Sequence, residues 1–277
     1  MNRMNRKGMK KTLCIALWAM AGAQLASAQI APVSASIPFI AFGGSTAPGN
    51  VNSWTTEFTF TNLGSTAAAL NLRWYGVTGQ PLSVPVVGAT RATTHQFVLA
   101  PSATLNFLLD NTEDALTSGW VAVDINGSVS GQAIFHYDLT GRPEYSTAAP
   151  LIRNGANNNL ILLGGGVPVS TVATPVTLAL PFNNVGNITG LSFANITSVA
   201  QVLTLNYLDL TGAVLMTQTT PLAPGALSAL PTSDPRLANQ KGTVVIAGDG
   251  SPYSAIAFVQ GTGANSGTLA TLLPITQ

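Results

Sequence analysis

Hydrophobic and polar residues alternate along most of this chain with the period of a β-strand. In residues 57–62 (Glu-Phe-Thr-Phe-Thr-Asn) the two phenylalanines fall on one face and the two threonines on the other. Similar segments recur every 8 to 14 residues and are separated by Gly, Pro and Asn, whereas helical spacing of apolar residues is almost absent. Short strands with one apolar face and frequent turns predict an all-β fold built from antiparallel β-sandwiches.

Three further segments show the same alternation and predict strands whose apolar positions form a core. Their inward residues are Leu70, Leu72 and Trp74, then Val121, Val123 and Ile125, and then Ala133, Phe135 and Tyr137.

The chain contains an internal repeat. Residues 58–82 align with residues 191–215 without a gap, at a constant offset of 133, and nine of the twenty-five positions are identical. Chance would give about two identities at average residue frequencies. The identical pairs are Phe60/Phe193, Asn62/Asn195, Ser65/Ser198, Ala67/Ala200, Leu70/Leu203, Leu72/Leu205, Thr78/Thr211, Gly79/Gly212 and Leu82/Leu215.

The repeat continues beyond this block at other offsets. At an offset of 123, residues 99–101 (Leu-Ala-Pro) match residues 222–224, Gly119 matches Gly242 and Phe135 matches Phe258. Upstream, residues 38–39 and 181–182 are both Pro-Phe. The second copy thus lacks ten residues around positions 81–94. In addition, the Thr-Gly pairs at 78–79 and 211–212 predict hairpin tips in which glycine takes a positive φ.

We divide the chain into a signal peptide (1–28), a first β-sandwich module (29–153), a spacer (154–175) and a second module (176–277). The first 28 residues carry five basic residues, an apolar run from Leu13 to Leu25 and a final Ala-Ser-Ala. That apolar run is much shorter than the roughly 20 residues that cross a bilayer, so we expect export with cleavage before Gln29 and no transmembrane segment in the mature chain. The spacer is rich in Asn and Gly around an apolar piece, Leu160 to Leu163, which is a candidate for an extra strand.

Removal of the signal peptide changes the chemistry of the chain. The only cysteine, Cys14, is lost, so the mature chain has no thiol for a disulfide, a metal site or catalysis. Six basic residues remain against ten acidic ones, a net charge of −4. We therefore expect neither nucleic acid nor an anionic membrane surface as a partner.

These features resemble a known group of repeats. The residues are Trp54-Thr55-Thr56, the strand that ends Phe60-Thr61-Asn62, the turn at Thr78-Gly79, Leu99-Ala100-Pro101, Gly119-Trp120 and Gly131-Gln132-Ala133-Ile134-Phe135. Together they are similar to the tandem Ig-like β-sandwich repeats of secreted proteins from acidobacteria and other soil bacteria. The resemblance covers nearly all of the first module and, more weakly, the second, where Thr243 replaces Trp120. It implies an Ig-like fold and export, and it brings no catalytic residues.

Charged residues and histidines provide no recognisable catalytic or metal-binding motif. His95 and His136 lack a third ligand at suitable spacing, so we expect structural or solvent-facing roles for both and no metal site. Paired carboxylates of a glycosidase would come from Glu57, Glu113, Asp114, Asp124, Asp138 and Glu144. Most of them lie beside turns or at outward strand positions, which predicts solvated side chains. The cluster Asp110, Glu113 and Asp114 matches no calcium-binding loop.

Aromatic residues are the remaining candidates for ligand binding, because sugars stack on exposed rings. Trp74 shares a face with core leucines, whereas Trp120 lies opposite the face of Val121 and Val123. Trp54 follows an Asn-rich loop. Trp54 and Trp120 are therefore candidate ligand-binding residues, with packing beneath a loop as the alternative.

Three functions remain open. The first is a non-enzymatic extracellular, cell-surface or periplasmic protein with a structural or adhesive role and no cofactor. The second is binding of a surface polysaccharide through Trp54 or Trp120. The third is self-association or assembly with another protein through edge strands, for which the apolar segments 30–42 and 160–163 are candidates. The features that distinguish the copies lie in the first module, so we expect any specific binding there.

Overall fold

The computed structural model describes residues 35–109, 115–141, 144–154, 160–162, 177–262, 268–272 and 274–276. The predicted signal peptide lies outside these ranges, as do Asp110, Glu113 and Asp114. The described residues form antiparallel strands and one short 3-10 turn, η1 (Pro235–Leu237), so the predicted all-β fold class is confirmed. Within those ranges, no helix has the length and apolar character needed to cross a membrane.

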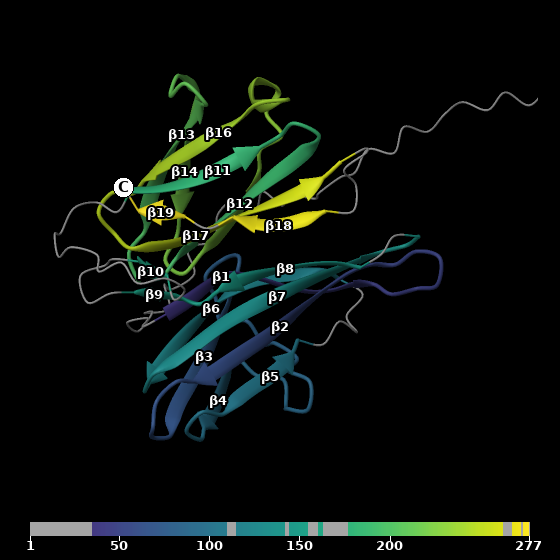
Figure 1. Ribbon diagram of the computed structural model, residues 1–277, viewed down its shortest axis with the longest axis vertical. Coiled ribbons are helices and arrows are strands. Elements are labelled where there is room, and N and C mark those ends of the chain that lie inside the picture. The colour runs from purple at the N-terminus through teal and green to yellow at the C-terminus, as the bar shows by residue number, and fades with distance from the viewer. Residues whose placement is uncertain are drawn as a thin grey trace, which may run out of the picture.

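The strands form two sets, which we term the first and the second sandwich (Figure 1). The first sandwich consists of β1 (Ala35–Ser45), β2 (Asn52–Asn62), β3 (Ala68–Gly76), β4 (Thr94–Leu99), β5 (Thr104–Leu108), β6 (Thr117–Asn126), β7 (Val129–Leu139), β8 (Tyr145–Pro150), β9 (Ile152–Asn154) and β10 (Leu160–Leu162). The second consists of β11 (Thr177–Asn183), β12 (Asn187–Asn195), β13 (Gln201–Asp209), β14 (Val214–Leu222), β15 (Leu227–Pro231), β16 (Lys241–Ala247), β17 (Tyr253–Gly261), β18 (Leu269–Leu272) and β19 (Ile275–Thr276).

The two sets pair their strands in the same order. One sheet of the first sandwich runs β4-β3-β6-β1-β9 and its counterpart runs β14-β13-β16-β11-β19. The other sheets run β5-β2-β7-β8 and β15-β12-β17-β18. In the first sandwich β1 joins the two sheets, because its end, Gly43–Ser45, pairs with β2. The module boundaries and the Ig-like assignment remain predictions.

Each sandwich encloses its own cluster of buried side chains, contributed by equivalent strands. On β2 and β3 the buried residues are Phe58, Phe60, Leu70, Leu72 and Trp74, and on β12 and β13 they are Leu191, Phe193, Leu203, Leu205 and Tyr207. Each pair differs by 133 in residue number, so the offset found in the sequence carries the core positions from one copy to the other. The alternation of buried and solvent-facing positions follows the strand period.

The turns that the two copies share also have the same backbone geometry. Gly79 and Gly212 have φ values of 80° and 88°, as predicted for the two tips. Asn62 and Asn195 are buried, and each uses its Nδ2 to bind three carbonyl oxygens of two neighbouring turns. The acceptors are Thr66, Leu99 and Ala100 in the first sandwich and Val199, Leu222 and Ala223 in the second.

The predicted match of Phe135 with Phe258 is wrong by one residue. Glu57 and Gly190 are equivalent, and Glu57 lies opposite Ile134, whereas Gly190 lies opposite Phe258. Phe258 is therefore equivalent to Ile134. A shift of one residue moves a side chain to the other face of a strand, so Phe135 lies in the first core while Phe258 points away from the second.

The outward side chains of β17 help to close the first sandwich. Ile256 is fully buried in the first core, and the Phe258 ring lies 5.1 Å from the rings of both Phe39 and Phe135. Phe39 faces this cluster because β1 loses its regular pairing with β6 between Ile37 and Ile40. Conversely, Ile152 of β9 packs in the second core. The two sandwiches thus share their cores, and β8 lies beside β18 where they meet (Figure 1).

Most of the described part of the segment predicted as a free edge is paired. Residues 35–42 belong to β1, where 35–37 and 40–42 pair with β6 and Ala35 and Ser36 also pair with β9 on the other side. One side of β1 is therefore occupied by β6 within the sheet. The other predicted segment forms β10, which pairs with β9 and with no other described strand.

Candidate functional site

A set of polar side chains occupies the outer face of β4, β3 and β6 in the first sandwich. On β3 the strand alternation directs Asn71 and Arg73 outward, because Leu70, Leu72 and Trp74 take the core positions. Asp124 on β6 lies directly opposite Asn71, and Gln96 on β4 lies opposite it on the other side. We call Asn71, Arg73, Gln96, Asp124 and Asn126 the polar face.

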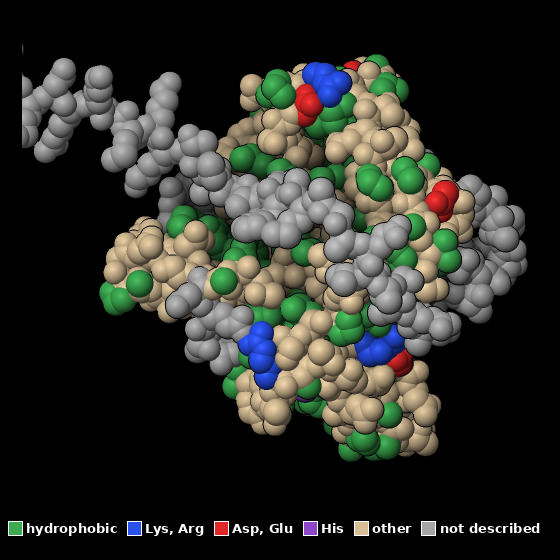
Figure 2. Space-filling model, turned by 180° about the vertical axis from the view of Figure 1, so that it is seen from behind, with side chains coloured by type: hydrophobic (Ala, Val, Ile, Leu, Met, Phe, Trp, Pro, Cys, Tyr) green, Lys and Arg blue, Asp and Glu red, His purple; other side chains and the backbone are tan. Residues whose placement is uncertain are grey.

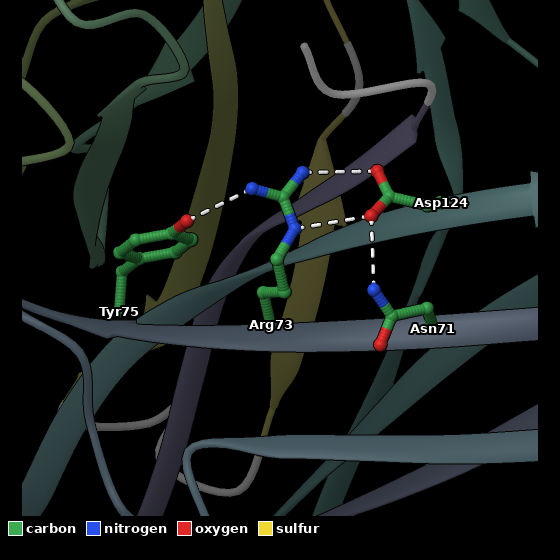
Figure 3. Close-up of polar contacts among 4 residues, drawn as sticks. All are labelled: Asn71, Arg73, Tyr75 and Asp124. Carbon is green, nitrogen blue, oxygen red and sulfur yellow. Dashed lines mark hydrogen bonds and ion pairs between the residues drawn. The ribbon is translucent and has the colours of Figure 1, made fainter. Parts of the chain in front are cut away.

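An ion pair organises the centre of this face. The Arg73 guanidinium donates from Nε to Oδ2 of Asp124 at 3.0 Å and from Nη2 to Oδ1 at 2.9 Å. Its Nη1 donates to the Tyr75 hydroxyl at 3.1 Å, and Asn71 Nδ2 donates to Asp124 Oδ2 at 3.2 Å. Figure 3 shows the guanidinium held between Tyr75 on one side and Asp124 on the other. Two parallel bonds fix the carboxylate in orientation as well as in position.

The surroundings of Arg73 keep its charge. Burial by itself would lower the pKa of Arg73, but the hydrogen bond to Asp124 and the charges of Tyr75 and Asp124 outweigh that effect and raise the pKa. The positive charge of Arg73 is therefore matched by Asp124 within the sheet face, and this central pair has no net charge.

All residues of the polar face except Arg73 line a shallow open depression of about 580 Å³. Side chains that line it include Ala69, Asn71, Gln96, Val98, Asp124 and Asn126. The Oδ1 atom of Asn71 is buried and accepts no hydrogen bond. A buried acceptor without a donor costs about 1–3 kcal/mol, so this atom is a position where a donor from outside would be favourable.

The second sandwich has no such face. The residues equivalent to Asn71, Arg73 and Asp124 are Thr204, Asn206 and Ala247, and Thr219 stands in place of Gln96. Sequence reasoning did not single out the polar face as a unit. The available signal was the pair Asn71 and Arg73 at outward strand positions. The equivalent strand of the second copy has Thr204 and Asn206 there and carries no charge at either position.

Trp120, one of the two predicted ligand-binding residues, is fully buried between the sandwiches. Its ring stacks on Tyr75 with centroids 4.7 Å apart and an interplanar angle of 17°. The cluster that covers it includes Ala194, Ile196 and Leu227 of the second sandwich. The alternation placed Trp120 outside its own core, but the second sandwich covers that face. The ring of Trp120 is therefore packed and not exposed in this structure, as in the packing alternative given for it.

Trp54, the other candidate, lies on the inner face of β2 and is only partly buried. Its ring stacks on Tyr137 of β7, with centroids 4.6 Å apart and an interplanar angle of 22°. Tyr145 of β8 follows at 6.1 Å from Tyr137. Burial, and then the neighbouring Tyr145, raise the pKa of Tyr137. The three rings form an aromatic row across one end of the sheet.

The histidines occupy different environments. His95 is buried, accepts a hydrogen bond from Trp74 Nε1 at Nδ1 (2.9 Å), and lies with Nε2 3.1 Å from the Thr90 carbonyl oxygen, which gives it a structural role. His136 lies on the outer face of β7 between two carboxylates, with Glu144 at Nδ1 and Glu57 3.5 Å from Nε2.

The carboxylates do not assemble into a metal centre within the described part of the chain, where no group of three potential ligands is placed to hold an ion. The acidic cluster of Asp110, Glu113 and Asp114, which matches no calcium-binding loop, lies outside that part. On the face shown in Figure 2, Lys, Arg, Asp and Glu side chains are scattered singly or in small opposite-sign groups, and most of the described surface is uncharged.

Comparison of the chain with protein-family models, with curated protein sequences and with solved structures gave no match.

Proposed function

We propose that this chain is an exported, non-enzymatic structural or adhesion-type protein whose two sandwiches act as one rigid unit. The observation that carries the proposal is the sharing of cores, since Ile256 of the second sandwich is fully buried in the first core and Ile152 packs in the second. Domains joined by a small polar interface normally move relative to one another, whereas a large apolar interface holds them together.

Hydrogen bonds across the boundary support the same proposal. The backbone N–H of Leu227 donates to the Val77 carbonyl oxygen at 3.1 Å. Ser192 donates from its hydroxyl to the Pro38 carbonyl oxygen at 2.9 Å, and the hydroxyls of Ser36 and Ser254 lie 3.0 Å apart. These bonds are directional, so they fix one relative orientation in addition to holding the faces in contact.

A rigid pair of sandwiches suits a spacer or an adhesive unit, because such a protein must present a surface at a fixed distance and angle. The arrangement also covers surface that would otherwise be exposed. β18 and β8, which end their sheets, lie beside each other, with the hydroxyls of Thr147 and Thr271 2.8 Å apart. Coverage of strands at sheet ends prevents unwanted pairing with other chains.

The proposal is tested on the purified mature chain in two ways. Residual dipolar couplings from both sandwiches should fit a single alignment tensor, and two independent tensors would contradict the rigid unit. Turnover assays with neutral polysaccharides and peptides should show no activity. Hydrolysis that Glu57→Gln or Glu144→Gln abolishes would overturn the non-enzymatic assignment.

Carbohydrate binding through Trp54 is the second candidate function. It is favoured by the row of Trp54, Tyr137 and Tyr145, in which the tryptophan ring is partly exposed and held in place by stacking. Rings fixed in this way lose little conformational freedom when a sugar stacks on them. Glycan-array binding that is lost in Trp54→Ala would support this candidate, and binding unchanged in that variant would remove it.

A further inference from the structure

We propose that the polar face of the first sandwich binds an uncharged polysaccharide. The inference rests on the proposed adhesive function, because it names what the rigid unit would adhere to. The depression above β4, β3 and β6 has a volume of about 580 Å³. It is open rather than enclosed, so a polymer can cross it and continue in both directions.

The side chains of the depression have the hydrogen-bonding chemistry that sugar hydroxyls require. A sugar hydroxyl both donates and accepts hydrogen bonds. An amide donates from its nitrogen and accepts at its oxygen, whereas a carboxylate only accepts. Asn71, Gln96 and Asn126 supply amides and Asp124 supplies the carboxylate. Gln96 and Asn126 are exposed, so they can turn toward a ligand.

Asn71 offers an acceptor that the protein itself does not use. Its Nδ2 donates to Asp124 on β6, and its Oδ1 points to the opposite side, where β4 lies (Figure 3). That Oδ1 is buried and accepts no hydrogen bond. A rotation of the exposed neighbour Gln96 would open Oδ1 to a donating hydroxyl while Asn71 stays bonded to Asp124, which would remove the cost of an unpaired acceptor.

The charge and the apolar surface of the depression select against other ligands. Asp124 is held in a two-bond ion pair by Arg73, so the centre of the site is neutral and does not attract a polyanion or a polycation. Val98 is 78% exposed and lies opposite the exposed Ala69 on the next strand. These two side chains form an apolar surface for the C–H groups of a sugar ring.

The site is also preorganised. Asp124 is fixed by Arg73 and Asn71, and Arg73 is held in turn by Tyr75, which stacks on the buried Trp120. The polar face is thereby connected to the joint between the sandwiches, and its side chains stand on strands rather than on loops. Groups held in position before binding lose less entropy when the ligand arrives.

The test uses affinity electrophoresis of the mature chain in gels that contain a neutral glucan, mannan, galactan or xylan, with a polyuronate as the charged comparison. The chain should be retarded by at least one neutral polymer. Gln96→Ala and Asn71→Thr should each weaken retardation by about three- to tenfold, as expected for one or two lost hydrogen bonds. Thr219→Ala is the matched control, because Thr219 is exposed at the equivalent position of the second sandwich, and it should change nothing.

Several results would overturn the inference. They are the absence of retardation by every neutral polymer, retardation by the polyuronate alone, or retardation that Trp54→Ala removes while Gln96→Ala does not. Concentration-dependent dimerisation that Val98→Lys abolishes would assign the face to a second copy of the chain instead. If the dipolar couplings still fit a single alignment tensor, any of these results would disprove polysaccharide binding at the polar face without disproving the rigid unit. The two proposals can therefore be tested independently.

Discussion

The indole N–H of Trp120 donates to the carbonyl oxygen of Gly225 at 2.7 Å, across the boundary between the two sandwiches. Trp120→Phe removes this donor and replaces the indole by a smaller ring, so it leaves an unpaired carbonyl oxygen and a cavity. We expect the free energy of unfolding to fall by at least about 1–3 kcal/mol, the cost of a buried polar group that loses its partner, with the cavity adding to the loss. Urea denaturation measures the change. Trp54→Phe is the control, since Trp54 is only partly buried, and an equal loss in both variants would contradict the role assigned to the Trp120 bond.

Gly79 and Gly212 occupy equivalent turns, but only Gly79 lies against the other sandwich. Both have a positive φ, so replacement by alanine strains the backbone at either position by about 1–2 kcal/mol. A Cβ at Gly79 would also overlap the Pro224 carbonyl oxygen, whereas a Cβ at Gly212 would meet nothing. Gly79→Ala should therefore be clearly the more destabilising in thermal unfolding. Equal effects would mean that the turn at Gly79 does not pack on the second sandwich.

Asn62 and Asn195 should make similar contributions to stability. Each binds three carbonyl oxygens and accepts a backbone N–H at Oδ1, from Gly64 and from Thr197 respectively, and Asn195 also accepts from the Thr197 hydroxyl. Alanine at either position should cost about 2 kcal/mol or more, because buried carbonyl groups lose their donor. Aspartate should also destabilise, since a carboxylate cannot donate. Denaturant unfolding of the two single variants and the double variant checks this, and one variant with no measurable loss would disprove the equivalence.

Ile256 should matter for the first sandwich although it belongs to a strand of the second. Ile256→Ala should lower the free energy of unfolding by about 2–5 kcal/mol, the range for a buried isoleucine that leaves a cavity. Native-state hydrogen exchange should show faster exchange in β1 of the first sandwich, which contacts β17. Ile246→Ala, in the second core, is the control, and protection of β1 that Ile256→Ala leaves unchanged would contradict the shared core.

Asp234 should titrate well below an ordinary carboxyl group. Hydrogen bonds from the side chain and backbone N–H of Arg236 lower the pKa of Asp234 to about 2 from its usual 3.8. Because the folded pKa is the lower one, the stabilisation from Asp234 is complete above about pH 3.8 and is lost as the pH falls through about 2. Carboxyl ¹³C chemical shifts follow the titration. Arg236→Ala should raise the pKa of Asp234 toward 3.8, and an unchanged value would contradict this cause.

Much of the fold could be predicted because its determinants are local. The alternation around Phe58 and Phe60 requires only that successive residues of a strand point to opposite faces. The offset of 133 then carried those positions to Leu191 and Phe193, which occupy the equivalent core. The match of Phe135 with Phe258 failed because the second copy has one extra residue between the aligned positions of β16 and β17, and identity between two phenylalanines hid the shift.

The candidate site was harder to predict. Asn71 and Asp124 are 53 residues apart, and they meet only because β3 and β6 pair in one register. For Trp54 the sequence could indicate an aromatic near a loop, but the stacking on Tyr137 depends on the pairing of β2 with β7.

The sequence by itself determined the strands, the faces of those strands and the equivalence of the two copies, because each of these depends on the spacing of residues along the chain. Trp120 shows what it could not determine. Its alternation with Val121 places it on the outward face, yet the residue that receives its hydrogen bond is 105 positions away. Whether an outward face meets solvent or another sheet depends on how the sandwiches pack. Only the tertiary structure decided that Trp120 is buried and that Asn71, Gln96 and Asp124 share an open face.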